Sequence, residues 1–111
     1  MVATLNALEA AELIATSNVD VIDVRDTDAY DAGHIPAARV VPLEVLRTDT
    51  DRELAGKPAL LFVCKSGVRS LNAAKLAERL GYDKIYTLDG GTDGWTRAGL
   101  PIAVERRAVA A

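Results

Sequence analysis

Residues 64–70, CKSGVRS, combine the types and spacing best suited to covalent chemistry. They include the only cysteine, Cys64, which ends the apolar run 59–64, and a helical pattern begins near Arg69. A thiol that ends a buried strand, before a glycine-containing loop and a helix, lies where backbone N–H groups can converge on one atom. The stretch therefore predicts a nucleophilic cysteine.

The loop after Cys64 has the features of an anion-binding cup. Gly67 lets the backbone curl without a Cβ, and Lys65 and Arg69 add two positive charges. Such surroundings favour the thiolate, because they can lower the pKa of a cysteine to roughly 3.5–7.5. We expect an ionised sulfur that is open to solvent.

The alternative is a structural cysteine, since a lone thiol at the end of an apolar run often packs as a small hydrophobic residue. A packing role does not require Lys, Ser, Gly and Arg in the next five positions. Arg69 would also oppose the helix dipole, at a cost of about 0.3–1 kcal/mol, unless an anion binds nearby. The context therefore favours reactivity.

Composition sets the broad class. The 111 residues suit one domain, and 50% apolar residues can build a core. A net charge of −3 argues against a nucleic-acid partner. No apolar run is long enough to cross a membrane, no secretory signal begins the chain, and one cysteine allows no internal disulfide. We expect a soluble, cytoplasmic protein.

Strand and helix patterns alternate along the chain. We predict strands at 19–25, 39–43, 59–64 and 84–88 and helices at 5–15, 27–32, 69–80 and 95–98, with one helical turn at 44–47, a polar loop at 48–53 and turns at 56–58 and 90–91. Asn6 and Glu9 have the spacing of a capping box, and Gly33 and Gly81 are predicted to end helices in the left-handed conformation. In helix 69–80, Leu71, Ala74, Leu76, Ala77 and Leu80 should face inward.

Strands separated by helices imply crossover connections, and therefore a mostly parallel sheet covered on both faces. Ligands of such sheets bind outside the carboxyl ends of the strands. Cys64 lies at such an end.

With these motifs assembled, the chain resembles the single-domain rhodaneses, which are sulfurtransferases. The resemblance rests on CKSGVRS at 64–70, VIDVR at 21–25, Tyr30 with GHIP at 33–36, and LDGGTDGW at 88–95. Ala37 and Lys65 depart from the family, which often has Gly and Arg there. The resemblance implies a three-layer α/β/α fold around a mostly parallel five-stranded sheet, a rhodanese-like domain at 1–103 and a flexible tail at 104–111.

The resemblance also implies a reaction. Cys64 would take a sulfur atom from a thiosulfate-like donor and pass it, as a persulfide, to cyanide, a thiol or a sulfur-acceptor protein, with no metal or organic cofactor. The substrate-binding residues would be Lys65, Ser66, Gly67, Val68, Arg69 and Ser70. Asp23 and Arg25 would support the loop, Trp95 would line the pocket or pack in the core, and His34 would be structural.

Two other functions stay open. Cysteine phosphatases use a similar cup, but their loop is longer than the four residues that separate Cys64 from Arg69 here. A persulfide carrier or a regulatory partner-binding module without catalysis would share the fold, although family members of that kind usually lack the cysteine.

Overall fold

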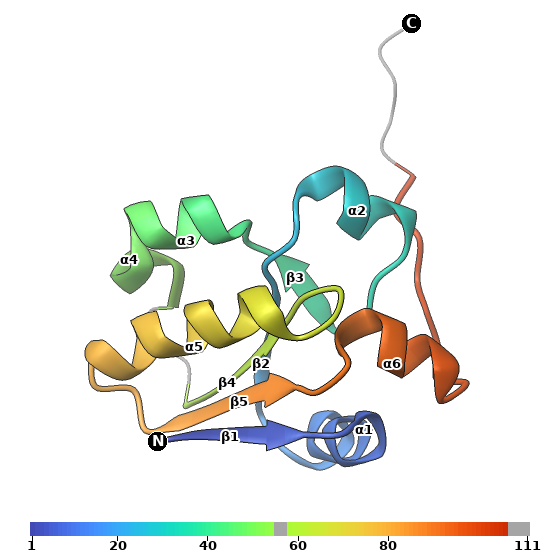
Figure 1. The fold of residues 1–111 in the computed structure, drawn as a ribbon, viewed down its shortest axis with the longest axis horizontal. Helices are drawn as coiled ribbons and strands as arrows, with labels where there is room; N and C mark the ends of the chain where they lie inside the picture. The colour runs from blue at the N-terminus through green and yellow to red at the C-terminus, as the bar shows by residue number, and fades with distance from the viewer. Residues whose placement is uncertain (55–57, 107–111) are drawn as a thin grey trace, which may run out of the picture.

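The computed structural model of the protein describes residues 1–54 and 58–106. A five-stranded sheet with the order β1-β5-β4-β2-β3 runs through the molecule, and all its neighbouring strands are parallel (Figure 1). Along the chain the elements are β1 (Val2–Leu5), α1 (Ala7–Thr16), β2 (Asp20–Asp23), α2 (Thr27–Ala32), β3 (Ala38–Val40), α3 (Leu43–Thr48), α4 (Thr50–Leu54), β4 (Ala59–Val63), α5 (Val68–Arg79), β5 (Lys84–Leu88) and α6 (Gly91–Arg97).

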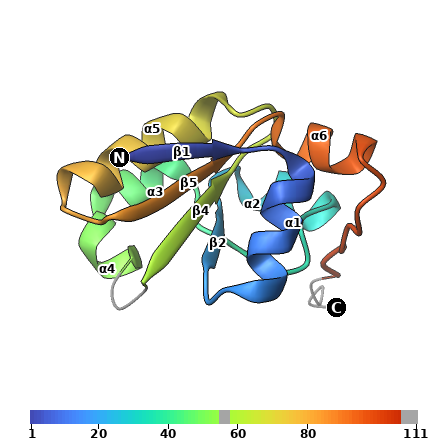
Figure 2. The same cartoon turned by 90° about the horizontal axis from the view of Figure 1, so that it is seen from below.

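Helices cover both faces of the sheet, so the predicted three-layer α/β/α fold is confirmed. On one face, α3, α4 and α5 contribute Leu46, Leu54 and Ala74 to an apolar cluster with alternate residues of the strands. On the other face, α1, α2 and α6 contribute Ala10, Tyr30 and Trp95. Figure 2 shows α5 and α1 on opposite sides of the sheet. No helix among the described residues is long and apolar enough to span a membrane.

The central strand β4 carries the predicted nucleophile to one edge of the sheet. All five residues of β4 are buried, as the uniform apolar run predicts. It pairs with β2 on one side and β5 on the other. Cys64 follows β4 directly and belongs to the apolar cluster beneath α5. The strand therefore delivers Cys64 to the carboxyl edge of the sheet, where the topology predicts a ligand site.

The N-terminal segment differs from its prediction. Residues 2–5 form the edge strand β1, which was not predicted, and α1 begins at Ala7 rather than at residue 5. The segment has no clear alternation, so only its pairing with β5 makes it a strand. The predicted capping box is confirmed: Asn6 Oδ1 accepts from the Glu9 amide at 2.8 Å, and Glu9 Oε1 accepts from the Asn6 amide at 2.9 Å.

The region after β3 is more helical than predicted. The polar loop expected at 48–53 is wrong, because α4 forms there and buries Leu54. Strand β3 covers only Ala38–Val40, and Pro42 instead precedes α3 as its N-cap. Part of the turn expected at 56–58 lies outside the described residues.

Two expectations about helix ends and faces are also wrong. Gly33 ends α2 with φ 170°, which is extended backbone rather than the left-handed conformation. Leu71 on α5 and Leu80 at its C-cap are exposed, whereas Ala73 is fully buried. Short side chains let α5 approach β4 and β5 closely, so its buried stripe is narrower than the apolar pattern suggests. Gly81 has the predicted positive φ, at 90°.

Residues 103 and 105, which follow α6, form backbone contacts with the segment around α2. Ala103 pairs with His34 in an isolated antiparallel bridge, and the Glu105 amide donates to the Asp31 carbonyl at 3.0 Å. Of the predicted tail 104–111, residues 107–111 lie outside the described part of the chain.

Candidate active site

The sulfur of Cys64 lies at the floor of the loop that joins β4 to α5. The Gly67 amide donates a hydrogen bond to Sγ at 3.0 Å. Gly67 has φ 107°, a left-handed conformation that glycine adopts without strain. The thiol donates to the Ser70 hydroxyl at 3.6 Å, and that hydroxyl donates to the Gly67 carbonyl at 3.1 Å. The loop thus wraps its own backbone around one sulfur atom.

Burial and hydrogen bonding act in opposite directions on the pKa of Cys64. Burial raises the pKa, but the Ser70 hydroxyl and the backbone amides of Ser70, Gly67 and Ser66 lower it. The hydrogen bonds outweigh burial, so the pKa of Cys64 lies below its ordinary value of 9.0. Donors directed at a sulfur favour its charged form, because they stabilise the thiolate more than the thiol.

The expectation that the sulfur is open to solvent is wrong. Cys64 is 1% exposed and Ser70 is fully buried, whereas Lys65, Ser66 and Val68 are exposed above them. The loop therefore displays its side chains outward and keeps the thiol beneath. Steric access to the sulfur is therefore narrow, and an incoming donor has to approach it with a small terminal group.

A second segment holds the loop in this shape. The amides of Thr92 and Asp93, at the start of α6, donate to the Cys64 and Lys65 carbonyls at 2.9 and 3.1 Å. Gly91 makes this approach possible, because a Cβ there would lie 2.3 Å from the Cys64 carbonyl oxygen. With these carbonyls bound by α6, the loop's own amides stay free to face the sulfur.

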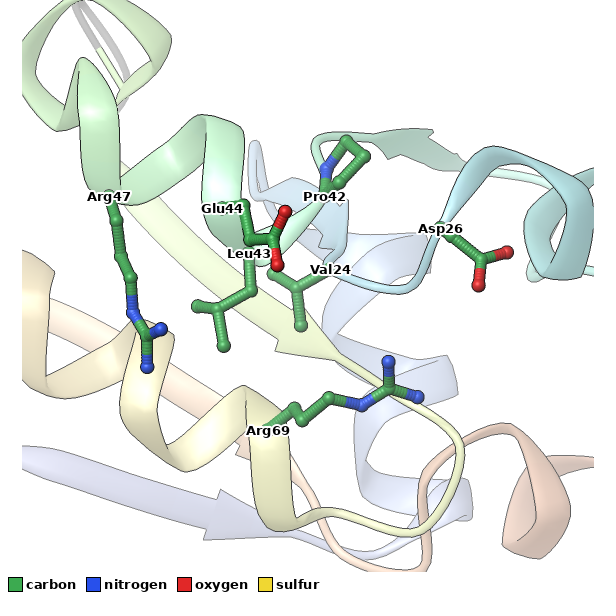
Figure 3. A pocket seen from close by; sticks show the side chains of 7 residues that line it. All are labelled: Val24, Asp26, Pro42, Leu43, Glu44, Arg47 and Arg69. Atoms are coloured by element: carbon green, nitrogen blue, oxygen red, sulfur yellow. The ribbon is translucent and has the colours of Figure 1, made fainter.

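Arg69 opens onto a cleft beside the loop. The cleft has a volume of about 280 Å³. Figure 3 shows Arg69 reaching into it from the first turn of α5 and Arg47 reaching into it from α3. Its other lining residues are Val24, Asp26, Pro42, Leu43 and Glu44. Lys65, the other predicted cation, does not line this cleft.

Asp23 and Arg25 form a buried ion pair behind the loop. Arg25 NH2 donates to Asp23 Oδ2 at 2.8 Å, and Arg25 Nε donates to Oδ1 at 3.0 Å. Arg25 NH2 also donates to the Gly33 carbonyl at 2.8 Å. These contacts tie the end of β2 to the turn after α2. None of them involves residues 64–70, so the predicted support of the active-site loop stays a prediction.

Trp95 and His34 lie away from the cleft. Trp95 is 4% exposed in the apolar cluster opposite to that of Cys64, and its Nε1 donates to the Pro101 carbonyl at 2.8 Å. It therefore packs in the core of the domain. His34 stacks on Tyr30 with ring centroids 3.8 Å apart, and its Nδ1 bonds to the Tyr30 carbonyl. Both residues stabilise the fold.

Several residues of the site were not predicted. Gly91, Thr92 and Asp93 hold the loop, but the sequence reads residues 90–91 as a turn. The motif LDGGTDGW at 88–95 marks this segment without indicating that it contacts the loop. Arg47 and Glu44 line the cleft only because α3 packs beside α5. No cluster of residues that could hold a metal ion occurs within 1–54 and 58–106.

Comparisons with known proteins agree with this arrangement. Residues 6–98 match the family model described as rhodanese-like domain. The thiosulfate sulfurtransferase GlpE of Actinobacillus pleuropneumoniae is 34% identical over 85% of this chain and 86% of its own. The structure of a rhodanese-related protein from Thermoplasma volcanium matches with a TM-score of 0.82 and 27% identity, over 93% of this chain and 99% of that one.

A third similarity concerns a different activity. A protein from Rhodopseudomonas palustris, described as a possible tyrosine phosphatase, matches with a TM-score of 0.79 and 29% identity, over 92% of this chain and 85% of that one.

The family match covers most of the chain, so the chain belongs to the rhodanese-like domain family. Within that family it is a rhodanese-type sulfurtransferase.

Proposed function

We propose that the protein transfers a sulfane sulfur from thiosulfate to cyanide or a thiol through a persulfide on Cys64. The observation that carries this proposal is the Gly67 amide directed at Sγ at 3.0 Å, within a loop that lowers the pKa of the thiol. The same donors suit a persulfide, which is also an anion. The single cysteine fits a reducing compartment, and we place the protein in the cytoplasm.

In the first half-reaction, the Cys64 thiolate attacks the outer sulfur of thiosulfate. The bond between the two sulfur atoms of the donor breaks, and sulfite leaves with the electron pair. The Ser70 hydroxyl, which now donates to the Gly67 carbonyl, can turn its hydrogen toward the charged sulfur. Arg69 and Lys65 supply positive charge for the sulfonate end of the donor, as Arg69 borders the cleft.

In the second half-reaction, the acceptor attacks the outer sulfur of the persulfide and Cys64 leaves as a thiolate. The chain has no second cysteine, so no internal thiol can resolve the persulfide. The acceptor, whether cyanide, a small thiol or a sulfur-acceptor protein, therefore comes from outside.

Intact-mass analysis tests the proposal. After incubation with thiosulfate the wild-type chain should gain one sulfur atom, and cyanide should remove it and yield thiocyanate. Cys64→Ser should gain nothing. An unmodified wild-type chain, or an equal gain on Cys64→Ser, would defeat the proposal.

Two activity assays separate the alternatives. A persulfide carrier would hold the added sulfur but release thiocyanate only in a single turnover, whereas an enzyme continues to release it while thiosulfate lasts. A phosphatase would instead hydrolyse p-nitrophenyl phosphate in a Cys64-dependent manner. We expect negligible hydrolysis, because four residues between Cys64 and Arg69 make a small cup.

A further inference from the structure

The cleft beside the loop contains two arginine side chains that no described residue pairs with. Arg47 and Arg69 both line it. Both side chains are exposed, and neither guanidinium group forms an ion pair or side-chain hydrogen bond with a residue in 1–54 or 58–106. A guanidinium group has five N–H donors in a planar fork that suits carboxylates. The cleft therefore offers two unused sites for anionic groups.

The two arginines lie toward different ends of the cleft. Figure 3 shows Arg69 on α5 beside the active-site loop. Arg47 extends from α3 toward a part of α5 farther from the loop, and Leu43 lies between the two arginines. Leu43 and Val24 give this middle stretch an apolar wall. The volume of about 280 Å³ is more than a thiosulfate ion needs. Cys64 is not among the lining residues and lies buried beneath the loop, which borders the cleft at Arg69. A ligand in the cleft would therefore direct its sulfur toward the loop at Arg69, its aliphatic middle along Leu43 and its charged head toward Arg47.

Glu44 adds a negative charge next to Arg47. The two residues are three positions apart on α3, so their side chains share one face of the helix. No ion pair joins them, and each remains available to a ligand. A carboxylate on Arg47 and an ammonium group on Glu44 together match the head of an amino acid.

From this lining we propose that the cleft is the acceptor site and that it selects a small thiol with an amino-acid head, through Arg47 and Glu44. The inference rests on the proposed function. The acceptor thiolate attacks the outer sulfur of the Cys64 persulfide, the bond between the two sulfur atoms breaks, and its electron pair remains on Cys64 as a thiolate. The acceptor leaves as a persulfide, and no further oxidant or reductant is consumed.

Four acceptors with equal carbon chains between sulfur and head test the charge preference. Homocysteine carries both charges, γ-mercaptobutyrate only the carboxylate, γ-mercaptopropylamine only the ammonium group, and γ-mercaptopropanol neither. The persulfide is formed with thiosulfate, separated from excess donor, and mixed with each thiol, and its loss is followed by intact mass. Comparing variant with wild type for each thiol removes differences in intrinsic thiol reactivity.

Arg47→Gln should slow transfer to homocysteine and γ-mercaptobutyrate by roughly threefold to tenfold, the size of one partly exposed charge-assisted contact. Its effect on γ-mercaptopropanol should be clearly smaller. Glu44→Gln should slow transfer to homocysteine and γ-mercaptopropylamine. Arg79→Gln, at the exposed far end of α5, is the matched control and should change no rate. Equal effects of Arg47→Gln on γ-mercaptobutyrate and γ-mercaptopropanol would overturn the inference.

A binding measurement keeps this result separate from the persulfide chemistry. Methionine, the S-methyl form of homocysteine, cannot accept sulfur but carries the same head. It should shift the backbone amide NMR signals of Glu44 and Arg47 in the wild-type protein and shift them less in Arg47→Gln. Failure to form a persulfide would count against the proposed function alone. Absence of any methionine-induced shift on α3 would count against the acceptor site.

Discussion

The Gly91→Ala substitution should disturb the active-site loop although residue 91 lies outside it. A Cβ on residue 91 would lie 2.3 Å from the Cys64 carbonyl oxygen and 2.4 Å from that of Lys65. Both obstacles are backbone atoms, so no side chain can turn away to relieve them. Gly91 also has φ 55°, and the left-handed conformation costs other residues about 1–2 kcal/mol.

The expected loss of stability follows from these contacts. To make room, the Cys64 and Lys65 carbonyls must move away from the amides of Thr92 and Asp93, and each lost bond costs about 0.5–1.5 kcal/mol. With the backbone conformation included, we expect the free energy of unfolding to fall by about 2–5 kcal/mol. The pKa of Cys64 should also rise toward 9.0, because the loop amides no longer converge on the sulfur.

Gly99→Ala is the matched control. Gly99 has φ 77°, and a Cβ there would meet nothing within 4 Å. It therefore carries the conformational cost without the collision. Urea unfolding gives the free energy, and the pH dependence of iodoacetamide alkylation gives the pKa of Cys64. If both variants lose the same free energy and keep the wild-type alkylation profile, the reasoning about α6 is refuted.

Other predictions concern the thiol and its support. Ser70→Ala should raise the pKa of Cys64, because one of the groups that lower it is lost, and the alkylation midpoint should move to higher pH; an unchanged midpoint would contradict this. Folding lowers the pKa of Cys64, so the resulting stability should be fully present above 9.0 and disappear as the pH falls through the folded-state pKa. In urea unfolding, the free energy of unfolding of the wild type minus that of Cys64→Ala should therefore increase with pH across that window. A difference that does not change with pH would argue against a lowered pKa. Asp23→Asn should cost about 3–5 kcal/mol in urea unfolding, since it strands the buried Arg25. Asp49→Asn, in an exposed pair with Arg52, should cost at most about 1 kcal/mol; equal losses would show that the buried pair has no special role.

The elements that local patterns define were predictable from the sequence. Strand β4 follows from an unbroken apolar run, and the start of α1 follows from Asn6 and Glu9, which satisfy each other's amides. The loop at Cys64 was predictable because its glycine, its cations and the following helix are contiguous. In each case the residues that form the structure are neighbours in the chain.

The features that depend on distant partners were not predictable. Strand β1 forms by pairing with β5, and no local pattern in residues 2–5 predicts a strand. Helix α6 begins at Gly91, although glycine is a poor helix former, because its first amides meet the Cys64 and Lys65 carbonyls. The burial of Cys64 likewise depends on the packing of α5 over the sheet, which no local spacing reveals.

The support that α6 gives to the loop has a consequence for synthesis of the protein. During translation, Cys64 leaves the ribosome before Thr92 and Asp93. The amides of these two residues bind the carbonyls at the start of the loop. Until those residues emerge, the nascent chain has the thiol without its finished surroundings, and we expect the sulfur to behave as an ordinary cysteine. Reactivity would then arise only as α6 docks, so an incomplete chain would not undergo premature sulfur chemistry.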